Sequence, residues 1–320
     1  MAAVDRGKAV LVNKDVSLSV ADHDFTKLKL TPSVTLVCDV PATISETFYH
    51  GQVFVTVKDA VLQPSTPLRR ATELQRVLTL TAVNPVLKPI LLLYADGGPD
   101  HRITYVSVQV SLITIFRYLN LDYLVAARTA PMQSFRNPVK RCMALLNLGL
   151  QGVGIMRECL PRDDWERRLA SCNSMSDIRT LFAEKPQLHG PITDSLSGAF
   201  QVICGVLERL KLSDKTVRTV PAATDEEMME LWSVLKAVDA SLLPEDTTRK
   251  AVESKKDLRA YLDLCCVRCH YFFAIEKEVW RRNLQDLWPS YLISRSLSTT
   301  SSLSRSRSVA IQQGALQVIC

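Results

Sequence analysis

The sequence has few features that would place the protein in a membrane or outside the cell. No apolar run reaches the ~18–20 residues that a membrane-spanning helix needs. No secretory signal peptide is evident, and the nine cysteines follow no disulfide-framework spacing. No internal repeat is evident either. These absences predict an intracellular protein with reduced thiols and without a transmembrane segment, and a nuclear location is compatible with them.

Length and composition set broad limits. A chain of 320 residues accommodates one large domain or two ordinary ones, and an apolar fraction of 47% is ample for a packed core. The net charge of +6 permits binding to nucleic acid. Because a charge of this size is also common on ordinary protein surfaces, it does not by itself indicate a nucleic-acid partner.

The most informative stretch begins with the short apolar run Ile90–Ala95, which ends on Asp96. Such a run predicts a strand buried on both faces, as in a parallel sheet. Apolar residues at spacings of three and four then predict a helix over 105–119, and a second apolar run predicts a strand over 121–127. Asn137-Pro138 opens a further helix, with Asn as cap and Pro at the first helical position. This order indicates a right-handed βαβ unit with Asp96 at a strand end where α/β sheets bind ligands.

Upstream of that stretch, the patterns predict strands followed by one helix. Short or alternating apolar segments predict strands at 9–12, 34–38 and 51–57. Ser65-Thr66-Pro67 predicts a helix start, and Asn84-Pro85 its end. The fold class expected from the whole pattern is α/β (α+β), a mixed sheet flanked by helices.

Three strings in this region carry a family resemblance. They are Tyr94-Ala95-Asp96-Gly97-Gly98-Pro99-Asp100-His101-Arg102, Arg128-Thr129-Ala130 and Asn137-Pro138-Val139-Lys140-Arg141. Together they resemble the RNase H-like core of transposase-derived animal proteins, which are similar to D-D-E transposases of the broad mariner type. The resemblance covers roughly residues 1 to 157. It implies DNA cleavage by three carboxylates that hold two divalent ions ~3.5–4 Å apart, one activating the nucleophile and the other stabilising the leaving oxygen.

Two departures from the family pattern determine the expected activity. Asp96 matches the second carboxylate, but Lys140 occupies the third position, and no Asp or Glu lies between Asn137 and Arg157. The first carboxylate belongs to a strand upstream of a segment like residues 2–8, so the sheet is expected to lack its first strand. The resemblance therefore implies a domesticated or degenerate, catalytically inactive protein without a metal site or cofactor. Magnesium or manganese would be needed only by an active enzyme. Lys140 is expected to pair with Asp96 and to neutralise the former cation site.

Basic residues crowd the edge of the sheet at which Asp96 is expected. A binding role needs only such a basic groove, and DNA is then the expected partner, while a homo-oligomer is also compatible with the sequence. The candidate nucleic-acid-binding residues are Arg128, Arg136, Lys140 and Arg141, with Arg102 beside them.

Other functions stay open at this point. An active metal-dependent transposase or nuclease would need two further carboxylates, and Asp39 at a strand end is the best stand-in for the first, although Asp beside Pro41 is also typical of a turn. Asp22-His23-Asp24 has the residue types of a metal site but reads equally as a polar loop. A protein-interaction module, or a transposon remnant without a function, is equally compatible with the sequence.

The sequence predicts three parts: an RNase H-like domain at 1–158, a helical extension at 159–290 and a disordered Ser/Arg-rich tail at 291–320. Within the extension, Cys265, Cys266, Cys269 and His270 offer half of a zinc site, but no further ligand follows at finger-like spacing. The alternative is a buried helical stripe. Its members are Leu258, Tyr261, Leu262, Cys265, Cys269 and Phe272.

Overall fold

The structure is a computed structural model of the whole chain. It describes residues 2–3, 9–13, 16–19, 28–38, 43, 45–47, 49–81, 89–130, 132–244, 248–277 and 315–319. The chain divides into two compact units, each built from separate stretches. Unit 1 comprises residues 1–34, 53–65 and 142–222, and unit 2 comprises residues 35–52, 66–141 and 223–320.

The described residues form a mixed α/β protein. The strands are β1 (Ala2–Ala3), β2 (Ala9–Asn13), β3 (Val16–Ser19), β4 (Lys29–Cys38), β5 (Gly51–Asp59), β6 (Ile90–Ala95), β7 (Tyr123–Arg128), β8 (Lys211–Leu212), β9 (Lys215–Thr216), β10 (Arg218–Pro221), β11 (Cys266–Arg268), β12 (Phe272–Glu276) and β13 (Ala315–Ile319). The α-helices are α1 (Pro67–Thr81), α2 (Val106–Tyr118), α3 (Pro138–Gly149), α4 (Asp163–Ser171), α5 (Met175–Glu184), α6 (His189–Leu207), α7 (Asp225–Ser233), α8 (Arg249–Ser254) and α9 (Lys256–Cys265). Short 3-10 helices are η1 (Ser134–Arg136), η2 (Pro186–Leu188) and η3 (Val234–Ala237).

Unit 2 contains an open mixed sheet with the strand order β5-β4-β13-β6-β7-β12-β11, to which β4 and β5 contribute residues 35–38 and 51–52. β6 and β7 are parallel over their whole length, from Ile90 opposite Tyr123 to Ala95 opposite Arg128. β13 runs parallel to β6 and antiparallel to β4. β12 is antiparallel to β7, and β11 is antiparallel to β12. The parallel β6–β7 pair therefore lies inside the sheet, with paired strands on both sides.

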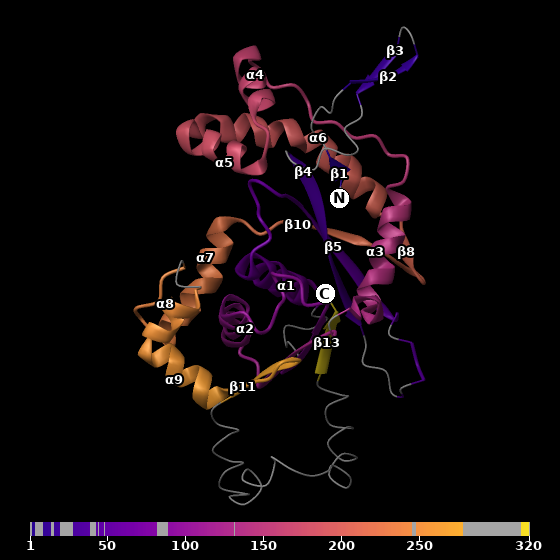
Figure 1. The fold of residues 1–320 in the computed structure, drawn as a ribbon. Helices are drawn as coiled ribbons and strands as arrows, with labels where there is room; N and C mark the ends of the chain where they lie inside the picture. Colours follow the sequence, from indigo (N-terminus) through magenta and orange to yellow (C-terminus); the bar gives the residue numbers. More distant parts are fainter. Residues whose placement is uncertain are drawn as a thin grey trace, which may run out of the picture. The chain divides into compact units, whose positions relative to one another are not determined.

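Two helices of unit 2, α1 and α2, pack against each other (Figure 1). α1 starts where the Thr66 hydroxyl accepts a hydrogen bond from the Arg69 amide at 3.2 Å. α2 carries an apolar stripe. The hydroxyl of its buried Thr114 donates a hydrogen bond to the Val110 carbonyl at 2.8 Å, so this polar group is paired although it is buried. α7 contacts both helices, and α8 and α9 follow it in contact with each other.

Unit 1 holds two strand pairs of the sheet, β10–β5 and β1–β4, together with a helical part. β10 is parallel to β5, from Arg218 opposite Phe54 to Pro221 opposite Val57, and β1 pairs with the start of β4. β2–β3 and β8–β9 form separate two-stranded sheets. α6 packs against β10, and a capping box between Ser174 and Asp177 starts α5.

The predicted strands at 9–12, 34–38, 51–57, 90–95 and 121–127 correspond to β2, β4, β5, β6 and β7. The predicted helices correspond to α1, α2 and α3. The coarse fold class, a mixed α/β arrangement with open sheets, is therefore confirmed.

Two expectations need correction. The region expected to be mainly helical also contains β8 to β12, and the tail expected to be disordered contains β13 at Ala315–Ile319. β13 also fills the sheet between β4 and β6, so the sheet of unit 2 has no empty place beside β6. The reason is long-range pairing. The five-residue strand β13 pairs with β4 and β6, which are distant in sequence, and no local pattern in the sequence predicts this pairing.

Some expectations fall on residues that the structure does not describe. Asp39, the Asp22-His23-Asp24 loop and the Ser/Arg-rich stretch 294–308 lie outside the described residues. The predicted domain boundaries at 158 and 290 stay predictions. Among the described helices, none is both long and apolar enough to cross a membrane.

Candidate functional site

Asp96 lies at the end of β6, in the loop where β6 and β7 present their carboxyl ends. Its carboxylate Oδ1 accepts a hydrogen bond from the Gly98 amide at 3.1 Å, because Gly97 adopts a positive φ of 80° and turns the chain back. Thr129, which follows β7, donates its hydroxyl to the Asp96 carbonyl at 3.1 Å and its amide to the Ala95 carbonyl at 2.9 Å. These bonds hold the loops after the two strands together and fix the Asp96 backbone.

The start of α3 brings the second site residue into place. Asn137 is 1% exposed, and its Oδ1 accepts a hydrogen bond from the Val139 amide at 3.1 Å. Its carbonyl accepts the Lys140 amide at 3.0 Å, which opens the helix. Pro138 is the first helical residue, where its missing amide hydrogen costs nothing. The predicted Asn cap is therefore confirmed, and Lys140 is the third residue of the helix.

Lys140 and Asp96 form an ion pair. Lys140 Nζ lies 2.7 Å from Asp96 Oδ2, and the two side chains are 36% and 25% exposed. Burial alone would raise the pKa of Asp96, but the hydrogen bond from Lys140, the Gly98 amide and the nearby positive charge together hold that pKa below its ordinary value. The predicted pairing is confirmed, and Asp96 is a carboxylate whose negative charge is compensated within the protein.

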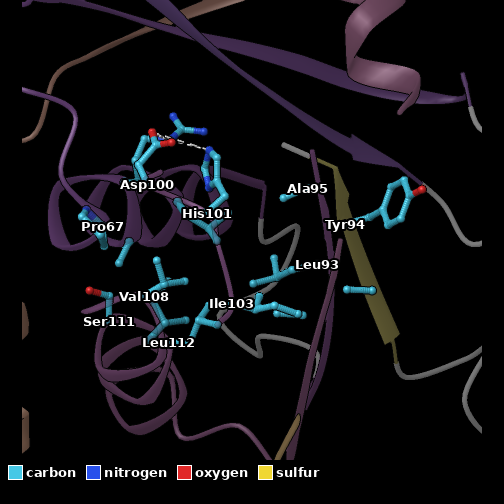
Figure 2. Close-up of a pocket in the computed structure, with 16 residues that line it drawn as sticks. Pro67, Leu93, Tyr94, Ala95, Asp100, His101, Ile103, Val108, Ser111 and Leu112 are labelled. Atoms are coloured by element: carbon cyan, nitrogen blue, oxygen red, sulfur yellow. Dashed lines mark hydrogen bonds and ion pairs between the residues drawn. The ribbon is translucent and has the colours of Figure 1, made fainter. Parts of the chain in front are cut away.

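A second polar cluster lies just after Asp96 in the chain. Arg70 of α1 is largely buried, donates Nε to His101 Nε2 at 3.3 Å and lies 3.7 Å from Asp100 Oδ2. Its Nη1 donates to Glu73 Oε2 at 3.2 Å, and Glu73 is 2% exposed. Figure 2 shows Asp100 and His101 next to each other at the rim of a pocket, and His101 Nε2 lies 3.7 Å from Asp100 Oδ2. Arg70 thus contacts Asp100 and His101 of the loop 99–103 and Glu73 of its own helix, so the cluster fastens that loop to α1.

The pocket beneath this cluster is small and apolar. It has a volume of about 50 Å³ and lies between α1, α2 and the strands β6 and β7. Leu93, Ile103, Val108 and Leu112 line it, while Tyr94 points to the other face of β6 (Figure 2). Ligand pockets for small molecules usually measure ~300–1,000 Å³, so this cavity does not fit a nucleotide or a sugar.

Arginine side chains stacked on tyrosine rings surround the Asp96 edge of unit 2; we call these residues the Arg–Tyr rim. The guanidinium carbon lies 4.9 Å from the ring centroid in Arg102–Tyr105 and 5.7 Å in both Arg128–Tyr271 and Arg141–Tyr49. Tyr105 and Tyr271 are 43% and 50% exposed. Stacking orients a guanidinium group while its edge stays available to an acceptor.

Arg128 is the best anchored member of the Arg–Tyr rim. Its Nε donates to the His270 carbonyl at 2.9 Å, and its Nη2 lies 2.8 Å from His270 Nε2. The aliphatic part of its side chain passes Gly97, where an added Cβ would lie 3.4 Å from Arg128 Cδ. Arg128 thus links the loop that carries Asp96 to the β11–β12 hairpin.

The geometry does not fit the pair of divalent ions that the family resemblance implies. Among the described residues, no group of three or more His, Cys, Asp or Glu side chains could hold a metal ion. Asp96 is already paired with an ammonium group, and Asp100 faces Arg70 and His101. Lys140 occupies the position at which the resemblance calls for the third carboxylate, and its ammonium group lies 2.7 Å from Asp96 Oδ2.

Among the described residues, the candidate zinc ligands Cys265, Cys266, Cys269 and His270 do not form a group that could hold a metal ion. Cys265 and Cys266 are buried at the junction of α9 and β11, whereas Cys269 and His270 are exposed, and His270 contacts Arg128. The alternative helical stripe is correct for Leu258, Tyr261, Leu262 and Cys265. It is wrong for Cys269 and Phe272, because the helix ends at Cys265 and the chain continues as β11.

Sequence reasoning found the basic residues but missed their partners. Tyr49, His270 and Tyr271 are loop residues that lie far from the βαβ unit in sequence and meet its arginines only in the folded protein. The Cys-x-x-Cys-His string did draw attention to 266–270, but for metal chemistry rather than for the contact with Arg128. Comparisons of the chain with models of known protein families, with curated proteins and with solved structures found no match.

Proposed function

We propose that this protein is a non-catalytic nucleic-acid-binding protein built on an RNase H-like core of the transposase type. The observation that carries the proposal is the 2.7 Å ion pair between Lys140 and Asp96. It puts a fixed cation where the resemblance calls for a divalent ion between two carboxylates. An ammonium group neutralises one charge but carries no open coordination site, so it cannot activate water or stabilise a leaving oxygen as a metal does.

The strand order of unit 2 supports the RNase H-like part of this proposal. After β5 the chain passes through α1, β6, α2 and β7, with β6 and β7 parallel, in agreement with the order that the resemblance implies. β13 lies between β4 and β6 and runs parallel to β6.

The Arg–Tyr rim supports the binding part. Arg102, Arg136 and Arg141 are exposed, and among the described residues no ion pair involves them. Cations in this setting suit phosphate oxygens, and the exposed rings of Tyr105 and Tyr271, beside Arg102 and Arg128, suit the face of a base. Lys140 also compensates the negative charge of Asp96, so this carboxylate repels a nearby phosphate less than an unpaired one would.

Salt-dependent binding tests the proposal. A fluorescently labelled duplex should bind wild-type protein with little sequence preference, and the affinity should fall steeply with salt because counterions are released. Arg128→Glu should weaken binding and lower the slope of log affinity against log salt by roughly 0.9 for each phosphate that the variant no longer neutralises. Arg249→Glu on α8 is the matched control, because Arg249 is an exposed arginine that forms its ion pair with a neighbour on its own helix, Glu253.

Two outcomes would contradict the proposal. Binding that stays unchanged between low and high salt, or that is unaffected by the combined Lys140→Glu and Arg141→Glu substitutions, would remove the nucleic-acid role. Metal-dependent DNA cleavage that disappears in Asp96→Ala would instead favour an active nuclease.

A further inference from the structure

The loop between β7 and α3 exposes two large apolar side chains. Met132 is 96% exposed and Phe135 is 69% exposed, the highest values among the large apolar residues that the structure describes. All residues from 132 to 136 are exposed, whereas Asn137, which follows them, is buried. Single exposed apolar side chains are common, but two of this exposure on one short loop indicate an interaction site. We call residues 132–135 the apolar tip.

Hydrogen bonds within unit 2 fix the backbone on both sides of the apolar tip. Before it, the Thr129 amide donates to the Ala95 carbonyl of β6 at 2.9 Å. After it, the amide of the buried Asn137 donates to the Ser134 carbonyl at 3.0 Å, and the same Asn137 caps α3. The apolar tip is therefore presented from the sheet and from the start of a helix.

Met132 has a backbone conformation that is unusual for methionine. Its φ is 64°, in the left-handed region that glycine adopts freely and that is unfavourable for a residue with a Cβ. Residues held in such conformations cluster at sites that contact ligands. Glycine at this position would avoid both the strain and the exposed apolar surface, so the presence of methionine favours a binding role for its side chain.

The surroundings of the apolar tip are cationic in sequence and in structure. Arg128 of the Arg–Tyr rim precedes it, and the exposed Arg136 directly follows Phe135. No Asp or Glu occurs between Tyr123 and Arg157. An apolar tip between cations matches duplex DNA, which has anionic phosphates outside and stacked base faces inside. Phe and Met are among the side chains that DNA-bending proteins insert between base pairs.

We propose that the apolar tip inserts Met132 and Phe135 between adjacent base pairs of duplex DNA, while neighbouring arginines contact the flanking phosphates. This inference rests on the nucleic-acid-binding function proposed above and adds the form of DNA that is recognised. Insertion unstacks a base step, and the cost is lower at pyrimidine–purine steps and at mismatched bases. The protein therefore selects duplexes that deform easily, and it does so without reading the identity of the bases.

The fluorescence of 2-aminopurine, which is weak in a base stack and strong outside it, tests the insertion. One duplex has a pyrimidine half followed by a purine half, so that it contains a single pyrimidine–purine step, and 2-aminopurine replaces the adenine of that step. A second, end-labelled pair of duplexes differs only by a mismatch at that step. The wild-type protein should raise the fluorescence and should bind the mismatched duplex roughly 5- to 30-fold more tightly than the paired one. A salt titration is recorded in parallel.

The combined substitutions Met132→Gly and Phe135→Ser remove the apolar surface of the tip. The variant should fold, because both side chains are exposed and glycine adopts the φ of residue 132 without strain. It should lose the fluorescence increase and the preference for the mismatch. The slope of log affinity against log salt should stay the same, because no cation is removed. Phe135→Leu alone should retain most of both effects, since leucine is also an effective inserting side chain.

The matched control combines Met229→Ser with Leu264→Ser. These two side chains are 51% and 64% exposed and belong to α7 and α9, which carry no member of the Arg–Tyr rim. The control should keep both the fluorescence increase and the mismatch preference. A loss of equal size in the control and in the tip variant would overturn the insertion, because the effect would then follow from exposed apolar surface in general.

The salt titration separates failure of the insertion from failure of the proposed function. Salt-dependent binding without a fluorescence increase, or with an increase that the tip variant retains, would overturn the insertion and leave nucleic-acid binding in place. Equal affinity for the paired and mismatched duplexes would do the same. Absence of salt-dependent binding to either duplex would overturn both proposals and would point to a protein as the partner of the apolar tip.

Discussion

Lys140 Nζ lies 2.7 Å from Asp96 Oδ2, so two residues 44 positions apart in the sequence form one neutral pair at the end of β6. The pair requires the turn at Gly97, which directs the Asp96 loop, and the Asn137 cap, which places Lys140 in the first turn of α3. A cation near a helix start is unfavourable to the helix dipole by a few tenths of a kcal/mol (roughly 0.3–1). The contact with Asp96 offsets that cost.

The pH dependence of stability should report this pair. The folded-state pKa of Asp96 is depressed, so its stabilisation is present above the ordinary carboxyl pKa and is lost as pH falls through the folded value. Lys140→Met removes the charge but keeps the stem, and burial should then raise the pKa of Asp96. The difference in free energy of unfolding between wild type and variant should be largest above about pH 4 and shrink below it.

Denaturant unfolding at several pH values measures this difference. Lys250→Met on the exposed face of α8 is the control, and it should show no such pH dependence. A wild-type advantage that is the same at all pH values would mean that the Lys140 contribution comes from packing and not from the ion pair.

The cap of α3 should be worth more than an exposed cap. Asn137 is buried, and Asn137→Ala should lower the free energy of unfolding by about 1–2 kcal/mol, because the Val139 amide loses its acceptor. Asn137→Ser should recover part of this loss. Thr248→Ala, which removes the exposed cap of the six-residue helix α8, should cost less. Equal losses in urea unfolding would argue against a special role for the Asn137 cap.

Replacing Gly51 by Ala and replacing Gly205 by Ala should change the free energy of unfolding in opposite directions. A Cβ at Gly51 would lie 2.2 Å from the Val37 carbonyl oxygen, and backbone atoms of β4 cannot yield without breaking the sheet. Gly51→Ala should therefore destabilise unit 2 by more than about 1 kcal/mol. Gly205 lies inside α6 with open space around its Cβ position, so Gly205→Ala should stabilise by about 0.5–1 kcal/mol. Thermal unfolding of both variants checks the pair, and a stable Gly51→Ala protein would contradict the β4–β5 pairing.

Tyr271 should contribute to binding of single-stranded nucleic acid through its ring. It is half exposed beside Arg128, and base stacking on an aromatic side chain is worth ~1–3 kcal/mol. Tyr271→Ala should weaken binding of a labelled oligonucleotide by roughly 5- to 150-fold, whereas Tyr271→Phe should bind nearly as wild type. Tyr118→Ala, on the partly exposed end of α2, is the control. Equal weakening by the Ala and Phe variants would point to the hydroxyl and not to stacking.

The βαβ unit was predicted well because each of its elements has a recognisable local sequence pattern. Ile90–Ala95 is short and apolar, 105–119 has helical periodicity, and Asn137-Pro138 is a cap followed by a favoured first residue. The site pairing followed from these three predictions together. An Asp at the end of β6 and a Lys in the first turn of α3, the helix that follows the neighbouring strand β7, meet at the same edge of the sheet.

The strands added from the C-terminal half were not predictable in the same way. Phe272–Glu276 and Ala315–Ile319 are five-residue segments whose partners in the βαβ unit, β7 and β6, lie more than a hundred residues away, so this pairing depends on the assembled sheet and not on local propensity. The Arg128–Tyr271 stack of the Arg–Tyr rim was missed for the same reason, since β12 brings Tyr271 beside β7. The three-residue strand β11 has no periodicity to detect.

Manganese binding tests the central claim, that Lys140 has taken the place of a metal ion beside Asp96, most directly. Electron paramagnetic resonance of Mn²⁺ titrated with protein counts bound ions without requiring catalysis. Wild type should bind none at the site, whereas Lys140→Glu should gain binding, because two carboxylates then face each other and a cation relieves their repulsion. The gain should vanish in the double variant Lys140→Glu, Asp96→Asn. Wild-type protein that binds manganese, and loses it on Asp96→Asn, would contradict the account.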